Sequence, residues 1–267
     1  MVNPITDKPN VKKVVSLLKR HCNKPIQIKN IEEFAQKPGT SYIANYLGTV
    51  KEYSERIEVH LNYSVAENVR EAILVHELLH ILMRHRGFPG IATRAEESSR
   101  ILQLLAPQLE KLRYFFSSTV DHLYIYKIMQ TDFNLDLAPY YEAHIKAKTT
   151  RFSRFSFKDS PKNAEYYFQV QQDILEGLEY YEYPNPYRQN ILQLFKETDP
   201  DGFASCSALY SKLRKMGFST PENMYRCANL IKIQIIKYGE KKSVGEFNLL
   251  WNAINVVRDA QEIPLEN

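Results

Sequence analysis

Cysteine is scarce in this chain of 267 residues, and glycine is also infrequent. The three cysteines, Cys22, Cys206 and Cys227, lie far apart, and none has the C-x-x-C spacing of a metal-binding thiolate pair. Their number and spacing therefore favour neither a disulfide framework nor a cluster of thiolate ligands. Any metal ion bound by this chain is expected to use histidine and carboxylate ligands.

The sequence also lacks a long apolar run and a strong excess of either charge. The first residues have neither the basic flank nor the apolar stretch of a secretory signal, and no stretch approaches the length of a membrane span. The net charge of +4 is small for a chain of this length and does not favour nucleic acid as a partner. We therefore expect a cytoplasmic protein with no membrane partner.

The feature that carries chemistry is the segment His76-Glu77-Leu78-Leu79-His80. Two histidines four residues apart on a helix are about one turn apart, so both imidazoles point the same way and can share one ion. Zn²⁺ fits such a pair at about 2.0 to 2.1 Å from each nitrogen. Glu77, rotated by about 100° around the helix, can address a water on that ion as general base without binding the metal.

The context of this segment predicts a buried helix that follows short strands. Strands are expected at residues 25–29, 42–47 and 56–63, and the last of them alternates apolar and polar residues, which predicts one buried and one wet face. An amphipathic helix is expected over residues 10–21, and a helix that is apolar almost all round over residues 66–85.

These residues resemble the HExxH signature of the zincin superfamily of metallopeptidases, including the apolar flanks of the motif. The resemblance implies a zinc ion held by His76 and His80, with Glu77 as the general base in the hydrolysis of peptide bonds. The metzincin extension is excluded, because it requires glycine and histidine where this chain has Met83 and Arg86.

Spacing leaves the third zinc ligand open among four residues. His122 is favoured, because we expect it in the first turn of a helix that begins at residues 118–121, which resemble a capping box, and runs to about residue 131. The neighbouring carboxylate of Asp121 could orient the imidazole. Glu97 is the main alternative, on a preceding helix that opens at a capping box at residues 93–96 and runs to about residue 116. Asp121 itself and His144 are the remaining candidates.

The chain as a whole is predicted to be α+β and predominantly helical. A zincin-like portion with a small sheet and the active-site helix is expected over residues 1–150, and a helical bundle over residues 160–267. The polar segment 148–162 separates the two, and Gly217 and Gly239 are placed at helix C-termini. The basic and aromatic residues at 151–158 are more typical of a packed connector than of a nucleic-acid surface.

The sequence therefore predicts a cytoplasmic zinc peptidase that acts on a peptide or protein. The alternatives are a catalytically silent regulatory or binding protein of the same fold, and a purely structural helical protein with an accidental motif. An oxyanion-stabilising residue is expected near the metal, among Tyr124, Tyr126, Tyr140, Tyr141 and His144. Oligomeric state is not predicted.

Overall fold

The computed structural model describes residues 4–32, 47–93, 105–135, 138, 141–142, 145–146, 164–242, 248–263 and 265. Over these residues the chain is predominantly helical with two small sheets, so the predicted α+β class is confirmed. It forms two compact units. The first contains residues 1–87, 127–140 and 263–267, and the second contains residues 88–126 and 141–262.

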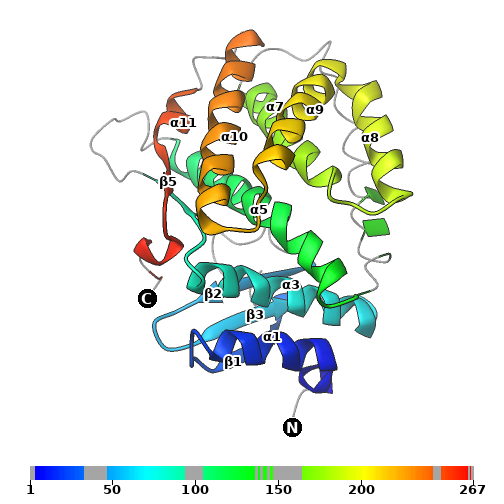
Figure 1. The fold of residues 1–267 in the computed structure, drawn as a ribbon, viewed down its shortest axis with the longest axis vertical. Coiled ribbons are helices and arrows are strands. Elements are labelled where there is room, and N and C mark those ends of the chain that lie inside the picture. Colours follow the sequence, from blue (N-terminus) through cyan, green and yellow to red (C-terminus); the bar gives the residue numbers. More distant parts are fainter. Residues whose placement is uncertain are drawn as a thin grey trace. The chain divides into compact units, whose positions relative to one another are not determined.

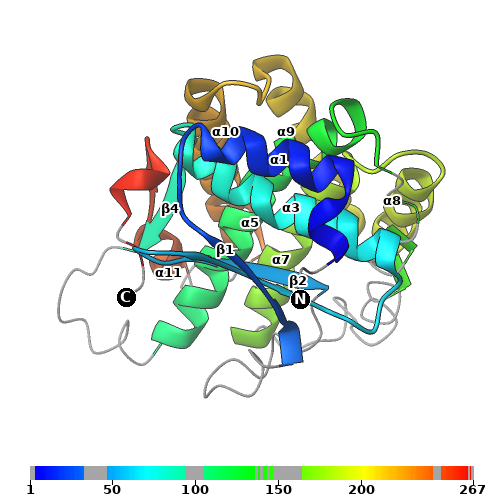
Figure 2. The same cartoon turned by 90° about the horizontal axis from the view of Figure 1, so that it is seen from below.

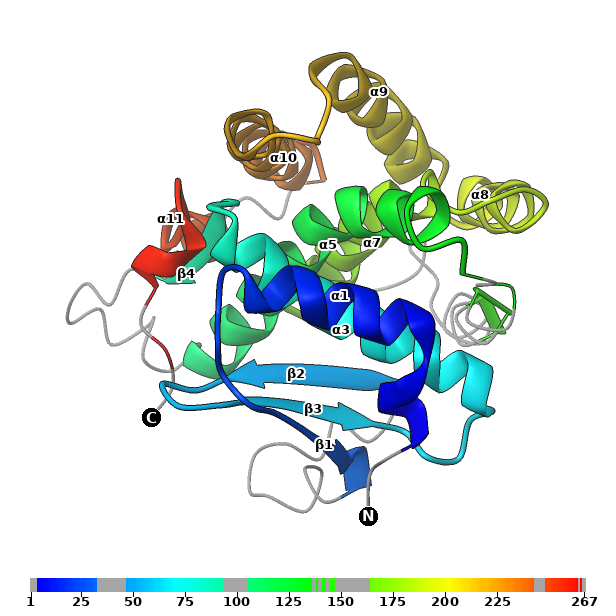
Figure 3. The same cartoon turned by 60° about the horizontal axis from the view of Figure 1, so that its bottom comes forward.

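The first unit is a three-stranded sheet with two helices on one face (Figures 2 and 3). Its main elements are η1 (Pro4–Asp7), α1 (Pro9–Lys19), β1 (Ile26–Asn30), β2 (Gly48–Glu52), β3 (Ile57–Leu61) and α3 (Glu67–His85). The strand order is β1-β3-β2, with β1 parallel and β2 antiparallel to β3. The predictions of α1, β1, β3 and α3 are confirmed. The strand expected at residues 42–47 lies almost entirely outside the described residues, and β2 was not predicted.

The central strand β3 is buried on both faces, so the prediction of one wet face is wrong. Glu58 and His60 are each only 1% exposed. Glu58 is compensated by Lys29 from β1 and by Arg56, each with a nitrogen 2.7 Å from its Oε1. Burial raises the pKa of Glu58, but these two cations outweigh it and lower that pKa to about 2. The alternation of apolar and polar residues located the strand correctly, but it did not indicate that both faces of the strand are buried.

The helix α3 is buried because its apolar residues face more than one element. It contacts α1, β2 and β3, and residues 72–76 are all at most 4% exposed. Gly87 follows it with a φ of +74°, a left-handed conformation that glycine adopts without strain. This ends α3 where the sequence predicted.

The second unit is mainly helical. Its elements are β4 (Gly90–Thr93), most of α5 (Ala106–Thr131), α7 (Ala164–Tyr180), α8 (Tyr187–Thr198), α9 (Pro200–Met216), α10 (Pro221–Lys241), α11 (Leu249–Asn252), β5 (Ile254–Val257) and η4 (Ala260–Glu262). The helix α9 contacts α7, α8 and α10 (Figure 1). The antiparallel pair β4 and β5, which was not predicted, joins residues far apart in the chain. No helix in the described residues is both long and apolar enough to cross a membrane.

Several predicted helix ends need correction. The break expected near residue 118 is absent from the described part of the chain, because α5 runs without interruption from Ala106 to Thr131. Gly239 lies inside α10 rather than at its end, where a Cβ would come within 2.8 Å of Asn248 Oδ1. Gly217 does follow α9, with a φ of +75°. The connector at 148–162 and the capping box at 93–96 fall mostly outside the described residues.

Candidate metal centre

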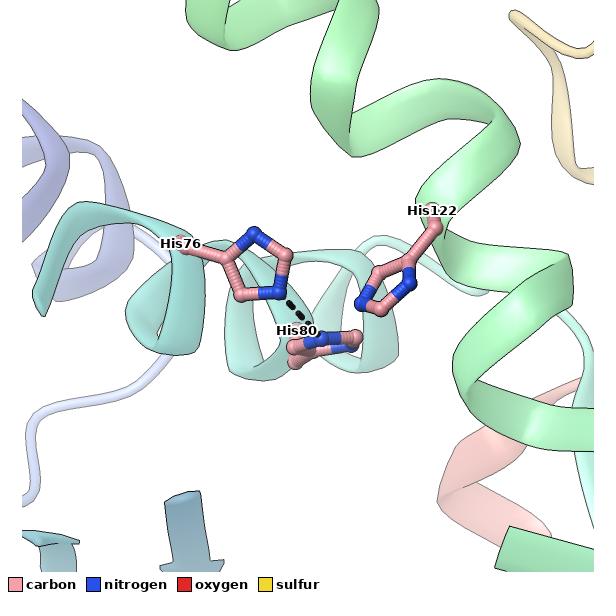
Figure 4. Close-up of side chains that lie close together, drawn as sticks. All are labelled: His76, His80 and His122. Atoms are coloured by element: carbon pink, nitrogen blue, oxygen red, sulfur yellow. Dashed lines mark hydrogen bonds between the residues drawn. The ribbon is translucent and has the colours of Figure 1, made fainter. Parts of the chain in front are cut away.

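His76 and His80 lie one turn apart on α3, and their Nε2 atoms point toward each other. The two Nε2 atoms are 3.2 Å apart, and the ring planes cross at 73° (Figure 4). Two nitrogens that share a tetrahedral zinc ion at the usual bond length are separated by about 3.3 Å. The imidazole pair is therefore already close to the geometry that one shared ion requires. His76 is 4% exposed, which keeps its ring away from bulk water.

Glu77 lies between these histidines in sequence and beside the start of β2 in space. Its Oε1 is 3.4 Å from the position that a Cβ on Gly48 would occupy. The side chain is half-buried, unlike the neighbouring apolar residues of α3. A carboxylate in this position can exchange protons with a molecule at the edge of the site.

His122 lies in the middle of α5, not in the first turn of a helix as predicted. Its Nδ1 is 3.1 Å from Oε2 of Glu179 on α7, and Glu179 Oε1 accepts a 2.8 Å hydrogen bond from Thr119 Oγ1. His122 and Glu179 are 8% and 6% exposed. A carboxylate that accepts the Nδ1 proton leaves the Nε2 lone pair for a metal. Ser118 Oγ lies 3.2 Å from that Nε2.

His122, the third ligand predicted from the sequence, lies in the second unit, whereas His76 and His80 lie in the first. Three imidazoles are a donor set that suits zinc and leaves a fourth position for a reacting molecule. The alternatives Glu97 and His144 lie outside the described residues.

Sequence reasoning missed Glu179 and gave its role to Asp121. The only signal for Glu179 was a glutamate that follows the apolar residues Ile174, Leu175 and Leu178 in a helix. A buried carboxylate in such a place needs a partner. The sequence could not indicate that the partner lies 57 residues earlier on α5.

Among the tyrosines considered for oxyanion stabilisation, Tyr126 lies beside His122, with 4.8 Å between the ring centroids. Tyr124 stacks on Phe88 with 5.3 Å between ring centroids. Tyr126 and Tyr141 are fully buried and pack with Tyr183, so they are part of an aromatic core. Tyr140 and His144 lie outside the described residues.

A second cluster at the end of α3 joins Cys22, Glu52 and His85, whose potential ligand atoms also lie within 4.8 Å of one another. Here Glu52 Oε1 is 2.7 Å from His85 Nε2 and 2.8 Å from Lys24 Nζ, and Glu52 Oε2 is 3.4 Å from Arg84 Nε. Burial raises the pKa of Glu52, but the hydrogen bonds from Lys24 and His85 outweigh it and leave the pKa below its ordinary value. Two fixed cations repel a divalent ion, so we interpret this cluster as a buried ion-pair network.

Comparisons of the chain with models of protein families, with curated proteins and with solved structures gave no match. The functional interpretation therefore rests on the residues of this chain and on their geometry. The imidazole pair on α3, with Glu77 beside it, is the feature on which a function can be argued.

Proposed function

We propose that this protein is a zinc-dependent peptidase of the zincin type. The observation that carries the proposal is the 3.2 Å separation of the Nε2 atoms of His76 and His80 on one face of a buried helix. The residue between them in sequence is a carboxylate at the edge of β2, as general-base chemistry requires. The donor set has only neutral nitrogens, which zinc accepts and which magnesium and calcium do not favour.

In this proposal His122 is the third ligand and Glu179 holds it in place. The Glu179 carboxylate accepts the proton on Nδ1 of His122, which fixes the tautomer and the orientation of the ring. Thr119 in turn donates to Glu179, so the carboxylate is itself held.

In the proposed hydrolysis, the zinc ion and the residues of the chain have separate roles. When bound, zinc supplies a Lewis acid that polarises a peptide carbonyl and lowers the pKa of water. Glu77 takes the proton from the attacking water and returns it to the nitrogen of the leaving amine. Burial of His76 and of the surrounding apolar residues of α3 limits access of bulk water.

The experiment measures bound zinc and peptide cleavage in the wild type and in Glu77→Gln, with His21→Ala as a matched control at an exposed histidine. We expect zinc in all three proteins, and cleavage of a peptide library by the wild type and by His21→Ala only. Zinc in all three proteins with no cleavage by the wild type or by His21→Ala supports the catalytically silent binding protein instead. Purified protein that takes up no zinc overturns the metal site.

A further inference from the structure

A pocket of about 560 Å³ lies between α1, β1 and α3 in the first unit, within the range of about 300 to 1,000 Å³ typical of small-molecule sites. It is lined by Thr6, Val11, Lys12, Val15, Ser16, Lys19, Lys24, Pro25, Ile26, Ile28, Leu74 and Leu78. The imidazoles of the candidate metal centre and Glu77 do not line it. It therefore needs an explanation of its own.

The apolar lining of the pocket comes from α1, β1 and α3, each of which contributes apolar side chains. Ile26 and Ile28 alternate along β1 and so share one face of this strand, and both are half-exposed. Val15 on α1 is also half-exposed, whereas Leu74 and Leu78, one turn apart on α3, are 0% exposed. The pocket thus has a fully buried floor and apolar walls that an apolar ligand would cover.

The charged residues that line the pocket in the described part of the chain are all positive. Three lysines and no carboxylate line the pocket over the described residues. Lys12 pairs with Asp7 at 3.0 Å and Lys24 with Glu52 at 2.8 Å, but Lys19 has no ion-pair partner within the described part of the chain. Lys19 ends α1, and Lys24 lies in the short connection that leads to β1.

We propose that this pocket binds a single-chain amphiphile with an anionic head, of the class of medium-chain fatty acids. The alkyl chain would lie against the half-exposed side chains of Val15, Ile26 and Ile28, and the carboxylate would meet the ammonium of Lys19. A cationic head would face three lysines, and an uncharged head would gain no ion pair. The site differs from the metal centre, although Leu74 and Leu78 belong to the same helix as His76 and His80.

Calorimetric titration of the full chain with decanoate, decanol and decyltrimethylammonium, each below its aggregation concentration, tests the proposal. We expect one decanoate per chain with a negative heat-capacity change, the signature of apolar burial. Decanol should bind roughly three- to tenfold more weakly, and the cationic compound should not bind. Equal binding of all three, or no binding of decanoate, overturns the proposal.

Paired variants locate the bound molecule. Val15→Trp fills the pocket and should abolish decanoate binding, whereas Leu17→Trp, also half-exposed on α1 but outside the lining, should preserve it. Lys19→Glu should weaken binding roughly three- to tenfold, and Arg20→Glu should change it little. Unchanged decanoate affinity in both Val15→Trp and Lys19→Glu would place the ligand elsewhere. Zinc content, measured in the same samples, separates failure of this site from failure of the metal centre.

Discussion

The helix α3 carries two histidine-containing groups that differ in the charged residues around them. In the first, the ring nitrogens of His76 and His80 face each other. In the second, five residues further along, His85 donates to a carboxylate that Lys24 and Arg84 also approach. In the second cluster, Lys24 and Arg84 surround a carboxylate, whereas the first brings together two imidazole nitrogens. A histidine-rich group is therefore better judged by the charges around it than by its count of possible ligands.

The largest expected difference is in metal content. His76→Ala removes one of two nitrogens that would share the ion, so we expect bound zinc to fall from about one per chain to none after dialysis. His85→Ala should keep the zinc and lose thermal stability, because it removes a hydrogen bond from buried Glu52. Metal analysis and thermal unfolding of both variants measure this. Loss of zinc in His85→Ala would instead indicate that the second cluster takes part in binding the metal ion.

The second cluster should contribute stability rather than metal binding. Glu52→Gln leaves Lys24 and Arg84 largely buried without their anion, so we expect a loss of about 2 to 4 kcal/mol in the free energy of unfolding, with zinc retained. Glu55→Gln, in the exposed connection between β2 and β3, is the control and should change stability by less than about 0.5 kcal/mol. Denaturant unfolding gives both values. Equal stability of the two variants would show that the network is not stabilising.

A smaller effect is expected from the carboxylate behind His122. Glu179→Gln keeps the shape of the side chain but removes its charge, so zinc affinity should fall by about 10- to 100-fold. Glu182→Gln, whose carboxylate accepts from Tyr210 instead, should leave the affinity unchanged. Competition with a zinc chelator measures both dissociation constants. No change in Glu179→Gln would remove His122 as the oriented third ligand.

The smallest effect concerns the acid sensitivity of the sheet next to these clusters. The pKa of Glu58 is lowered from 4.5 to about 2 in the folded protein, so its contribution to stability is complete above the unfolded value and is lost as pH falls toward 2. Between pH 6 and pH 3.5 the wild type should lose about 1 kcal/mol through this group. Glu58→Gln should lack this part of the pH dependence. Urea unfolding at the two pH values measures it, and parallel losses in both proteins would contradict it.

The sequence could indicate the candidate residues of α3 because their spacing is local. His76, Glu77 and His80 are placed by the period of a single helix, and the apolar flanks predict its burial. The third histidine was singled out, but its position in the helix was wrong, because Ser118 and Asp121 resemble a capping box inside what is one long helix. Tertiary packing overrides such local signals.

Features that depend on pairing between distant segments were not predictable. Glu179 meets His122 across two helices, and β4 pairs with β5 although more than 150 residues separate them. The wet face expected for β3 was wrong for the same reason, since the cations that compensate Glu58 come partly from β1. The pattern of residues within one segment indicates the period of a helix or strand. It does not indicate which distant segment will pair with that element.

Gly48 sets a limit on variation near the Glu77 carboxylate. A Cβ at this position would lie 2.3 Å from Cγ2 of Ile73, a β-branched side chain with little rotational freedom on a helix. The strand and the helix can therefore approach this closely only while residue 48 has no side chain. Chains descended from the same ancestor that keep His76, Glu77 and His80 are expected to keep glycine here as well. Its replacement would mark lineages in which the helix and the strand have moved apart.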